Sequence, residues 1–415
     1  MAGITGMGTT FNLPNYHGEL FAITPTDTPL LSMAGGIGGG KQTTSTLFDW
    51  QTYDLRDPAS RPRLEGADAP NAEARVRAEV RNVVQIFQEA VTTSYTKQAA
   101  VGQYTTPGSA PFFQSDGLGG DAAIGNEHTW QVAQALKQIA RDVNYTFWNS
   151  KQVIPSDNTV ARQTAGLLQV IQTNKVFAGG SSEEVTASSA TDTITAASNG
   201  LSNGDQVVFT DPDVATGIRT DRTYYVVSAA SGTFKVAATP GGTAITLGTA
   251  APKYVRVSGA SGTTPVTVDL VNAFIQQIFD NGGLTEGDTR TLFVPSIQKT
   301  RLTKAYATAY GSNVNGALSA NAGSTVVGGV KVDKIVTDFG ELNLVVERAL
   351  PKDAIVAVSM EMVDPVFLSI PNKGVLFEEA LAKTGAADKT QIYGEIGLAY
   401  GAEHAHGVLR GLAVA

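Results

Sequence analysis

The sequence predicts an α+β protein that carries an inserted all-β domain. Two segments show the apolar spacing of amphipathic helices, and short strand-like runs lie on both sides of them. Between Gly179 and Gly262 the pattern changes to short β-rich runs separated by Gly-containing turns. The chain has 415 residues, enough for roughly two or three packed domains. We therefore expect mixed helices and strands, with the β segment as an additional domain.

Residues 1–48 are predicted to form an extended N-terminal arm. Pro14, Pro25 and Pro29 prevent a long helix, and the segment is poor in charge. An arm of this length has no core of its own, so we expect its apolar side chains to lie on another part of the protein or on a neighbouring copy. These side chains are Phe11, Leu13, Phe21, Leu30 and Leu31.

Residues 49–82 are predicted to form a charged β-hairpin that extends from the body. The stretch 54–81 holds six Arg and six acidic residues but no Lys, and strand-like runs at 46–53 and 80–96 flank it. Arg forms bidentate pairs with carboxylates of a partner, which Lys does less well. The alternative is a solvated loop whose surface ion pairs contribute about 0–1 kcal/mol each. The candidate contact residues are Arg56, Arg61, Arg63, Glu65, Asp68, Arg75 and Arg77.

Helical spacing follows the hairpin. Apolar residues recur every three or four positions after Asn126, a good N-cap, which predicts a long helix over 126–148. A second helix is predicted over 268–280, where Asn281 and two glycines end it. A shorter apolar segment lies at 166–177. The side chains expected in the core of the long helix are Trp130, Leu136, Val143 and Phe147.

The segment 179–262 is predicted to be an inserted β-sandwich-like domain. Turns of the Ser-Asn-Gly-Asp, Ser-Gly and Pro-Gly-Gly types separate its strands. Linkers rich in Gly and Ser bracket it at 179–182 and 258–262, so its two ends must lie close together. The expected strands are 191–197, 206–210, 223–228, 233–238, 243–247 and 253–258.

The remainder of the chain mixes strands with helices. A loop rich in Gly, Ala, Ser and Asn is expected at 307–324. The expected elements are a helix near 296–306, a strand pair over 391–412, and strands at 291–295, 326–337, 342–346, 354–358 and 375–383.

The motifs argue against an enzyme. Gly35–Lys41 has the spacing of a phosphate loop, but Gln42 replaces the hydroxyl that magnesium requires and a strand follows instead of a helix. Gly200–Gly204 fits a nucleophile elbow but lies in a predicted hairpin. His404 and His406 alternate in a strand-like run and could reach one metal, although a lone His-x-His pair does not define a site. We expect no catalytic residue, cofactor or metal.

Composition excludes further classes. The chain has no Cys, hence neither disulfides nor Cys-ligated metals. Its net charge is −8, whereas proteins that bind nucleic acid through the phosphates usually carry a basic surface. No basic start precedes an apolar segment, and no apolar run approaches the ~20 residues that cross a bilayer. We expect synthesis in the cytoplasm, with neither a signal peptide nor a membrane span.

Several short sequence motifs, which occur in a fixed order, indicate a family resemblance. They are Asn12-Leu13-Pro14-Asn15-Tyr16, Thr28-Pro29-Leu30-Leu31, Phe48-Asp49-Trp50-Gln51, Glu65-Gly66, Asn82-Val83-Val84-Gln85-Ile86-Phe87 and Arg162-Gln163-Thr164-Ala165-Gly166-Leu167. Together with the order of the segments, they make the chain resemble the major capsid proteins of tailed bacteriophages, which have the Hong-Kong-97-type capsid fold. The resemblance covers the chain outside the β insertion.

The resemblance implies a domain layout. The segments would be an N-terminal arm (1–48), an extended loop (49–82), a peripheral domain (83–178) with its spine helix (126–148), the inserted domain (179–262), an axial domain (263–345) and the return strands of the peripheral and axial domains (346–415). The extended-loop residues named above, and Phe11, Leu13, Phe21 and Leu30 of the arm, would then be contacts between subunits.

The resemblance also implies a function. The protein would be a structural major head protein that self-assembles, as hexamers and pentamers, into an icosahedral shell around double-stranded DNA without sequence-specific binding. Implied partners are a scaffolding protein, a portal protein and, for the inserted domain, a decoration protein. The shell would assemble in the host cytoplasm, mature from a procapsid and remain in the virion. Family members that cross-link covalently use a Lys in the extended loop, which this chain lacks, so we expect no cross-link.

Two alternatives remain open. The first is an encapsulin-like compartment, which has the same fold but encloses cargo enzymes. The second is a β-rich phage tail or adhesion protein in which 180–262 binds the target. The long helix at 126–148 and the central position of the insertion argue against the second alternative.

Overall fold

The computed structural model describes residues 24–56, 58–69, 74–99, 127–178, 182–196, 199–210, 217–259, 264–284, 290–311, 325–327, 330–383 and 385–414. They divide into two compact units. Unit 1 takes its described residues from Met1–Asp27, Gln88–Ile139 and Phe377–Tyr393. Unit 2 takes them from Thr28–Phe87, Ala140–Leu376 and Gly394–Ala415. Among the described helices, none combines the length and apolar character that crossing a membrane requires.

Unit 1 is a small sheet with helical segments. It contains most of β4 (Gln85–Ser94) and β19 (Leu376–Ala380), the first half of β20 (Ala387–Ala399), α2 (Tyr95–Ala99) and the first half of α3 (Glu127–Asn149). β20 pairs with both β4 and β19. His128 of α3 lies between two threonines of this sheet, with its Nδ1 3.0 Å from Thr93 Oγ1 and its Nε2 2.8 Å from Thr390 Oγ1.

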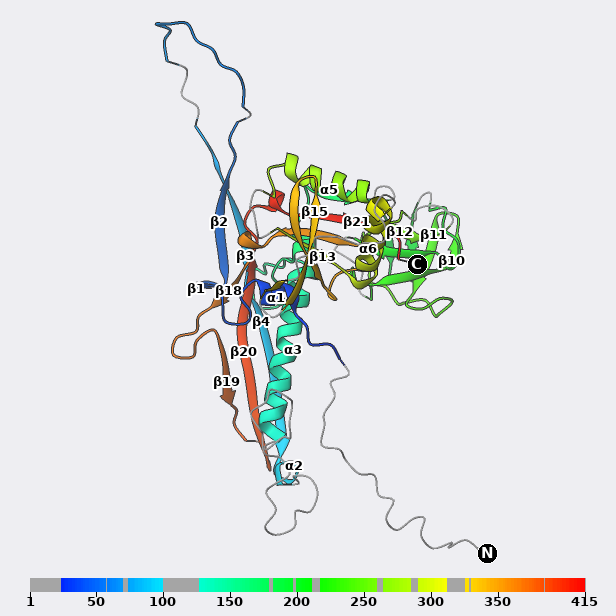
Figure 1. Ribbon diagram of the computed structural model, residues 1–415. Coiled ribbons are helices and arrows are strands. Elements are labelled where there is room, and N and C mark those ends of the chain that lie inside the picture. The colour runs from blue at the N-terminus through cyan, green and yellow to red at the C-terminus, as the bar shows by residue number, and fades with distance from the viewer. Residues whose placement is uncertain are drawn as a thin grey trace, which may run out of the picture. The chain divides into compact units, whose positions relative to one another are not determined.

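Unit 2 contains a seven-stranded mixed sheet. Its strand order is β14 (Thr325–Val327), β15 (Val330–Thr337), β16 (Gly340–Val346), β13 (Arg290–Val294), β17 (Ile355–Ser359), β21 (Gly407–Arg410) and β5 (Lys175–Phe177). Helices α5 (Val268–Asp280) and α6 (Ser296–Gly311) pack on this sheet (Figure 1). The apolar face of α5 is buried against strands β13 and β17, and the Thr267 side chain caps the helix by accepting from Leu270 N.

Residues 183–258 of unit 2 form a second seven-stranded sheet with its own core. The order is β6 (Glu183–Glu184), β12 (Lys253–Ser258), β9 (Gln206–Phe209), β10 (Thr223–Ala230), β11 (Thr233–Ala237), β8 (Thr193–Thr195) and β7 (Thr186–Ser188). The first and last of these, β6 and β7, are separated by Val185 alone, so the sheet returns to its starting strand as in a barrel. We call residues 183–258 the barrel (Figure 1).

The barrel corrects two expectations. A sandwich has two separate sheets, whereas this segment has one sheet that closes on itself. The described residues 243–247 form no strand, contrary to the prediction. Two strands that were not predicted, β6 and β7, follow the linker predicted at 179–182. β6 and β7 are needed for closure, because together they link both ends of the strand order.

The remaining strands of unit 2 lie near the N-terminal segment. β1 (Lys41–Thr43) pairs in parallel with β18 (Asp364–Leu368), which pairs with the second half of β20. β2 (Leu47–Tyr53) and β3 (Arg77–Val83) form a two-stranded antiparallel sheet. Unit 2 also contains the second half of α3, two short α-helices, α1 (Pro29–Met33) and α4 (Leu167–Val170), and two 3₁₀ turns, η1 (Met360–Met362) and η2 (Glu403–Ala405).

One predicted core position of the long helix differs from the structure. The long helix is confirmed as α3, with Val143 and Phe147 fully buried and Trp130 half-buried, but Leu136 is 41 % exposed. The buried stripe runs through Ile139, Val143 and Phe147 at four-residue steps, and four residues before Ile139 lies Ala135, so Leu136 falls beside the stripe.

The arm is corrected at one position. Leu30 is fully buried within its own chain, so it does not have the exposed surface expected of a contact with a neighbouring subunit. It packs on its own chain because α1 is held there by the polar groups described below. Phe11, Leu13 and Phe21 lie outside the described residues.

Candidate functional site

The hairpin of β2 and β3, residues 47–83, is exposed along most of its described length. Its strands pair only with each other among the described strands, from Leu47↔Val83 to Tyr53↔Arg77. Beyond the paired region the chain continues as a long loop (Figure 1). Leu55, Leu64 and Val76 are 66 %, 86 % and 81 % exposed. Covering these side chains with another protein surface would remove their apolar area from water.

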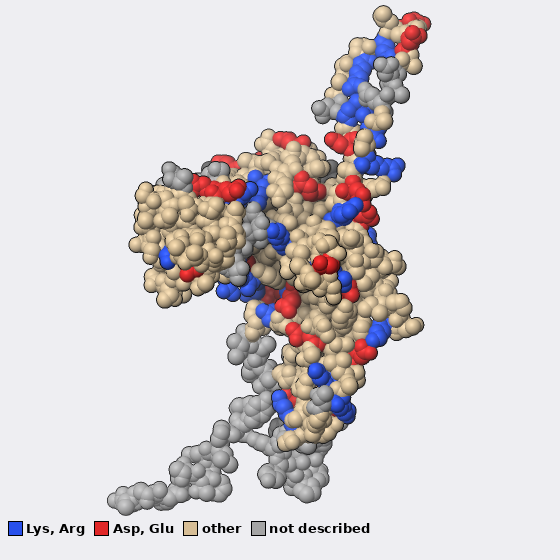
Figure 2. All heavy atoms as spheres, turned by 180° about the vertical axis from the view of Figure 1, so that it is seen from behind, with Lys and Arg blue, Asp and Glu red and all other residues tan. Residues whose placement is uncertain are grey.

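The predicted charged residues lie along this hairpin (Figure 2). Arg63 Nη1 donates to Asp68 O at 2.9 Å, and Arg77 Nη1 donates to Gln51 Oε1 at 3.0 Å. Both contacts are at the surface, where such interactions contribute about 0–1 kcal/mol. The side chains of Glu65 and Asp68 are exposed as well. Arg56, Arg61 and Arg75 are also exposed and have interactions within the chain.

The base of the hairpin is anchored to unit 2. Trp50 Nε1 donates to Gly401 O at 2.8 Å, and its ring meets the Tyr400 ring edge-on at 4.7 Å. Asn82 Nδ2 donates to Leu398 O at 2.7 Å. Burial, together with the charge of Glu403, raises the pKa of Tyr400 to about 12. The hairpin thus has a fixed base and an uncovered distal part.

A second set of polar contacts anchors α1 to unit 2. The Glu347 carboxylate accepts from Asn144 Nδ2 at 3.2 Å and from Leu30 N at 3.4 Å, and Leu31 N donates to Asn144 Oδ1 at 3.1 Å. These groups satisfy backbone donors in the first turn of α1, which has no side-chain cap at Thr28. Burial raises the pKa of Glu347, although hydrogen bonds, including one from Ala349 N, oppose the rise.

The raised pKa of Glu347 predicts a pH dependence of stability. Between pH 4.5, the ordinary pKa of glutamate, and the raised pKa of the folded state, Glu347 is protonated in the folded chain but ionised in the unfolded chain. Stability therefore falls as pH rises through the folded pKa, with a slope of up to about 1.4 kcal/mol per pH unit. When the free energy of unfolding of Glu347→Gln is measured with urea at a series of pH values above 4.5, this decrease should be missing. Glu361→Gln, at an exposed position, serves as the control and should keep the wild-type slope.

A buried ion pair lies where the barrel meets the seven-stranded sheet from β14 to β5, which we call the central sheet. Arg410 and Asp353 are 1 % and 0 % exposed, and Arg410 Nε lies 2.8 Å from Asp353 Oδ2. Arg410 Nη2 also donates to Phe209 O of the barrel at 3.4 Å. Val208, Val255 and Val257 on the barrel pack with Phe177 and Val414. The barrel is therefore held by apolar as well as charged contacts.

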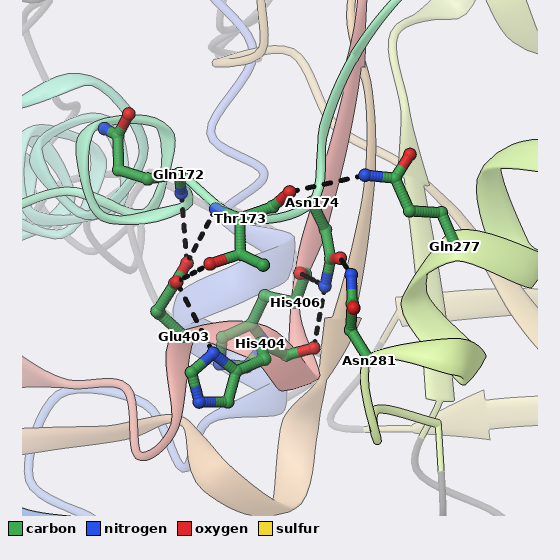
Figure 3. A network of polar contacts seen from close by, with 8 residues as sticks. All are labelled: Gln172, Thr173, Asn174, Gln277, Asn281, Glu403, His404 and His406. Atoms are coloured by element: carbon green, nitrogen blue, oxygen red, sulfur yellow. Dashed lines mark hydrogen bonds and ion pairs between the residues drawn. The ribbon is translucent and has the colours of Figure 1, made fainter.

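A polar network surrounds the turn at 400–406 (Figure 3). Gln172 N donates to Glu403 Oε2 at 3.0 Å, and the Thr173 hydroxyl donates to Glu403 Oε1. Burial raises the pKa of Glu403, but these hydrogen bonds outweigh it and hold the pKa below its usual range. Asn174 Nδ2 donates to the carbonyl oxygens of His404 and His406 at 2.8 and 2.9 Å.

The two histidines do not share a face. The strand pair predicted over 391–412 is not formed, because β20 and β21 belong to different sheets and η2 lies between them. The side chain of His404 is 58 % exposed, whereas His406 is fully buried. A pair arranged in this way does not offer two ligands to one metal. Within the described part of the chain, no group of three or more His, Cys, Asp or Glu could hold a metal ion.

Sequence reasoning missed most of the anchoring residues. Trp50 and Asn82 occur within the motifs that resemble the capsid family, whereas Glu347, Asp353 and Arg410 belong to no motif named above. A signal for the last three is that each charged residue stands beside an apolar run, where burial requires a partner.

Several solved structures match nearly the whole chain at low sequence identity. The capsid asymmetric unit of Cyanophage A-1(L) matches with a TM-score of 0.52 and 10 % identity over 97 % of this chain and 98 % of that chain. The structure titled Mycobacterium phage Che8 matches with a TM-score of 0.47 and 10 % identity, over 97 % of this chain and 98 % of that chain. The holo-SrpI encapsulin complex from Synechococcus elongatus PCC 7942 matches with a TM-score of 0.44 and 9 % identity, over 94 % of this chain and 93 % of that chain. At such identities the likeness concerns the fold alone, and of these three only the cyanophage match exceeds 0.5.

No curated protein sequence matches the chain significantly. A family model described as SU10 major capsid protein matches residues 3–413. The match includes the hairpin, α3, the barrel and the central sheet, and so nearly the whole chain. The fold, with its mixed helices and sheets, agrees with it. The chain belongs to the SU10 major capsid protein family and is a structural protein of the capsid shell.

Proposed function

We propose that copies of this chain assemble into a closed icosahedral shell around double-stranded DNA, and that the hairpin joins neighbouring copies. The observation that carries the proposal is the contrast within the hairpin. Trp50 fixes the base, whereas Leu64 and Val76 further along are 86 % and 81 % exposed. A neighbouring subunit that covers these side chains would remove their apolar surface from water.

The rest of the assignment follows the same proposal. The arm (1–48), the extended loop (49–82), the peripheral (83–178), inserted (179–262) and axial (263–345) domains and the return strands (346–415) would be the parts of the subunit. A scaffolding protein and a portal protein would take part in assembly in the host cytoplasm, and a decoration protein would bind the barrel. The net charge of −8 supports a wall that encloses DNA without gripping it.

Removing the positive charge of the hairpin is expected to weaken assembly. The variant Arg61→Ala/Arg63→Ala/Arg75→Ala/Arg77→Ala loses four exposed cations, and at about 0.5 kcal/mol per pair the interface would lose about 2 kcal/mol. Such a loss lowers the association constant at each interface more than tenfold. Sedimentation velocity of purified protein measures the fraction in shells, and circular dichroism checks that the subunit stays folded.

The matched control removes four positive charges elsewhere. Arg222→Ala, Lys235→Ala, Lys253→Ala and Lys373→Ala change the barrel and the turn after β18 but leave the hairpin intact. This control should assemble like the unmodified chain. An unchanged shell fraction in the hairpin variant would refute the proposed contact.

A further inference from the structure

The ring of His406 is buried between two backbone groups of unit 2. His406 is 0 % exposed. Its Nε2 lies 2.8 Å from Tyr400 O, and Ser359 N donates to its Nδ1 at 3.3 Å. A carbonyl oxygen only accepts and a backbone N–H only donates. The ring must therefore carry its hydrogen on Nε2 and none on Nδ1, which makes it the neutral tautomer.

A second proton on this ring conflicts with the structure. It would place an N–H at Nδ1 directly against the N–H of Ser359, and neither group could accept. An unfolded or opened chain has no such conflict, and there a histidine takes up a proton near pH 6.5. Acidification below that value thus favours any state in which His406 has left its position.

Other titratable groups lie on the elements around the ring. They are Glu403 and His404 (η2), Tyr400, Glu361 (η1), Asp280 (α5), Lys175 (β5) and Arg410 (β21). Arg410 is paired with Asp353, and Glu403 stays ionised near neutral pH because its hydrogen bonds hold its pKa low. A carboxylate nearby favours a charged ring, but it does not remove the donor that faces Nδ1. The side chain of His404 is 58 % exposed and lies two residues away, so it needs its own control.

The turn that His406 holds is also the anchor of the hairpin. His406 Nε2 donates to Tyr400 O, and the next residue, Gly401, accepts from Trp50 Nε1 at 2.8 Å. Gly401 has a φ of +59°, and a Cβ at this position would lie 2.8 Å from Met362 Cβ, so this turn requires glycine. The opposite side of the turn is fixed by Ser359 Oγ, which donates to Ala405 O at 3.2 Å, and by Asn174 (Figure 3).

We propose that His406 is a proton-sensitive lock on the base of the hairpin. With a neutral ring, the turn at 400–406 holds Trp50 and the hairpin keeps one direction. Protonation expels the ring, releases Tyr400 and Gly401, and frees the base of the hairpin to move. The lock is a property of a single subunit, and only its consequence for the shell, a pH-dependent strength of subunit contacts, rests on the proposed function.

Hydrogen–deuterium exchange of the full-length chain tests the lock. The backbone amides of 47–53 and 77–83 are measured at pH 7.5 and 5.5, corrected for intrinsic exchange, with the barrel strand Thr223–Ala230 as internal reference. One pH unit below 6.5 shifts the opening equilibrium up to about tenfold, so hairpin protection should fall by about that factor in the unmodified chain. His406→Gln keeps an amide donor and acceptor but does not titrate, and its hairpin protection should not change with pH.

The control is His404→Gln, which removes the exposed neighbouring histidine and should retain the full pH response. Loss of protection that persists unchanged in His406→Gln, or that disappears in His404→Gln, would overturn the proposal. If His406→Gln does not fold, the unmodified chain with labelled histidines gives the answer by NMR. One of its four histidine signals should stay neutral until hairpin protection is lost. Titration of all four signals with unchanged protection would equally contradict the lock.

Discussion

Replacing Asp353 with Ala is expected to lower the free energy of unfolding by about 3–5 kcal/mol, because it leaves the charge of Arg410 buried without a partner. Arg410 donates to both carboxylate oxygens, at 2.8 and 3.1 Å, and is 1 % exposed. Gly411 N loses its acceptor as well, which is 3.0 Å away in the intact pair. Urea denaturation followed by circular dichroism measures the change.

A double variant separates the ion pair from the packing. Asp353→Ala combined with Arg410→Met removes both charges, so it should be less destabilised than Asp353→Ala alone. Glu79→Ala is the surface control, since Glu79 and its partner Arg81 are 48 % and 56 % exposed, and it should cost at most about 1 kcal/mol. A loss below about 1 kcal/mol in Asp353→Ala would show that the buried pair does not stabilise the junction between barrel and sheet.

Shortening the hairpin is expected to abolish closed shells while the subunit still folds. Replacing residues 54–76 by Asn-Gly joins Tyr53 to Arg77, which already face each other across the two strands. Asn-Gly is the preferred two-residue hairpin turn. The anchors of the base, Trp50 and Asn82, are kept, so the melting transition should stay cooperative. Electron microscopy of the purified variant counts the shells.

The control for the shortened hairpin keeps the full length of the loop and makes two conservative substitutions within it. Ala59→Ser and Ala69→Ser lie in the same loop but remove neither an Arg nor a large apolar side chain. This variant should form shells at the normal yield. Shells of normal size and yield from the shortened chain would exclude the hairpin as a required contact.

Local patterns predicted the regular elements well. The helix α5 has the predicted bounds because its apolar face, its Thr267 cap and its glycine stop agree. The hairpin strands were predicted because charge and proline separate two β-rich runs. β9, β10, β11 and β12 were found close to their predicted positions, since glycine-containing turns bound each of them.

Features that depend on distant residues were not predictable in this way. β6 and β7 are short and follow a Gly/Ser segment, and they are strands only because they close the barrel. Asp353 and Arg410 are 57 positions apart, and Asn144 and Glu347 are 203 apart, so their partnership arises from the tertiary fold. His404 and His406 were expected to alternate in a strand, but the turn η2 separates their environments.

The candidate site was predicted in outline. The hairpin was identified from its charges, and Leu55, Leu64 and Val76 add an apolar component that the charge pattern did not reveal. Its anchor was not identified, because Trp50 meets Tyr400 and Gly401 across most of the chain length. The contacts of the distal hairpin stay a prediction, since they involve a second copy.

Self-assembly is the central claim, and electron microscopy of the full-length chain tests it most directly. The chain is expressed alone and together with a candidate scaffolding protein, and the high-mass fraction is imaged in negative stain. Closed shells of uniform diameter in at least one condition are the predicted result. A well-behaved monomer under both conditions would contradict the claim that this chain builds a shell.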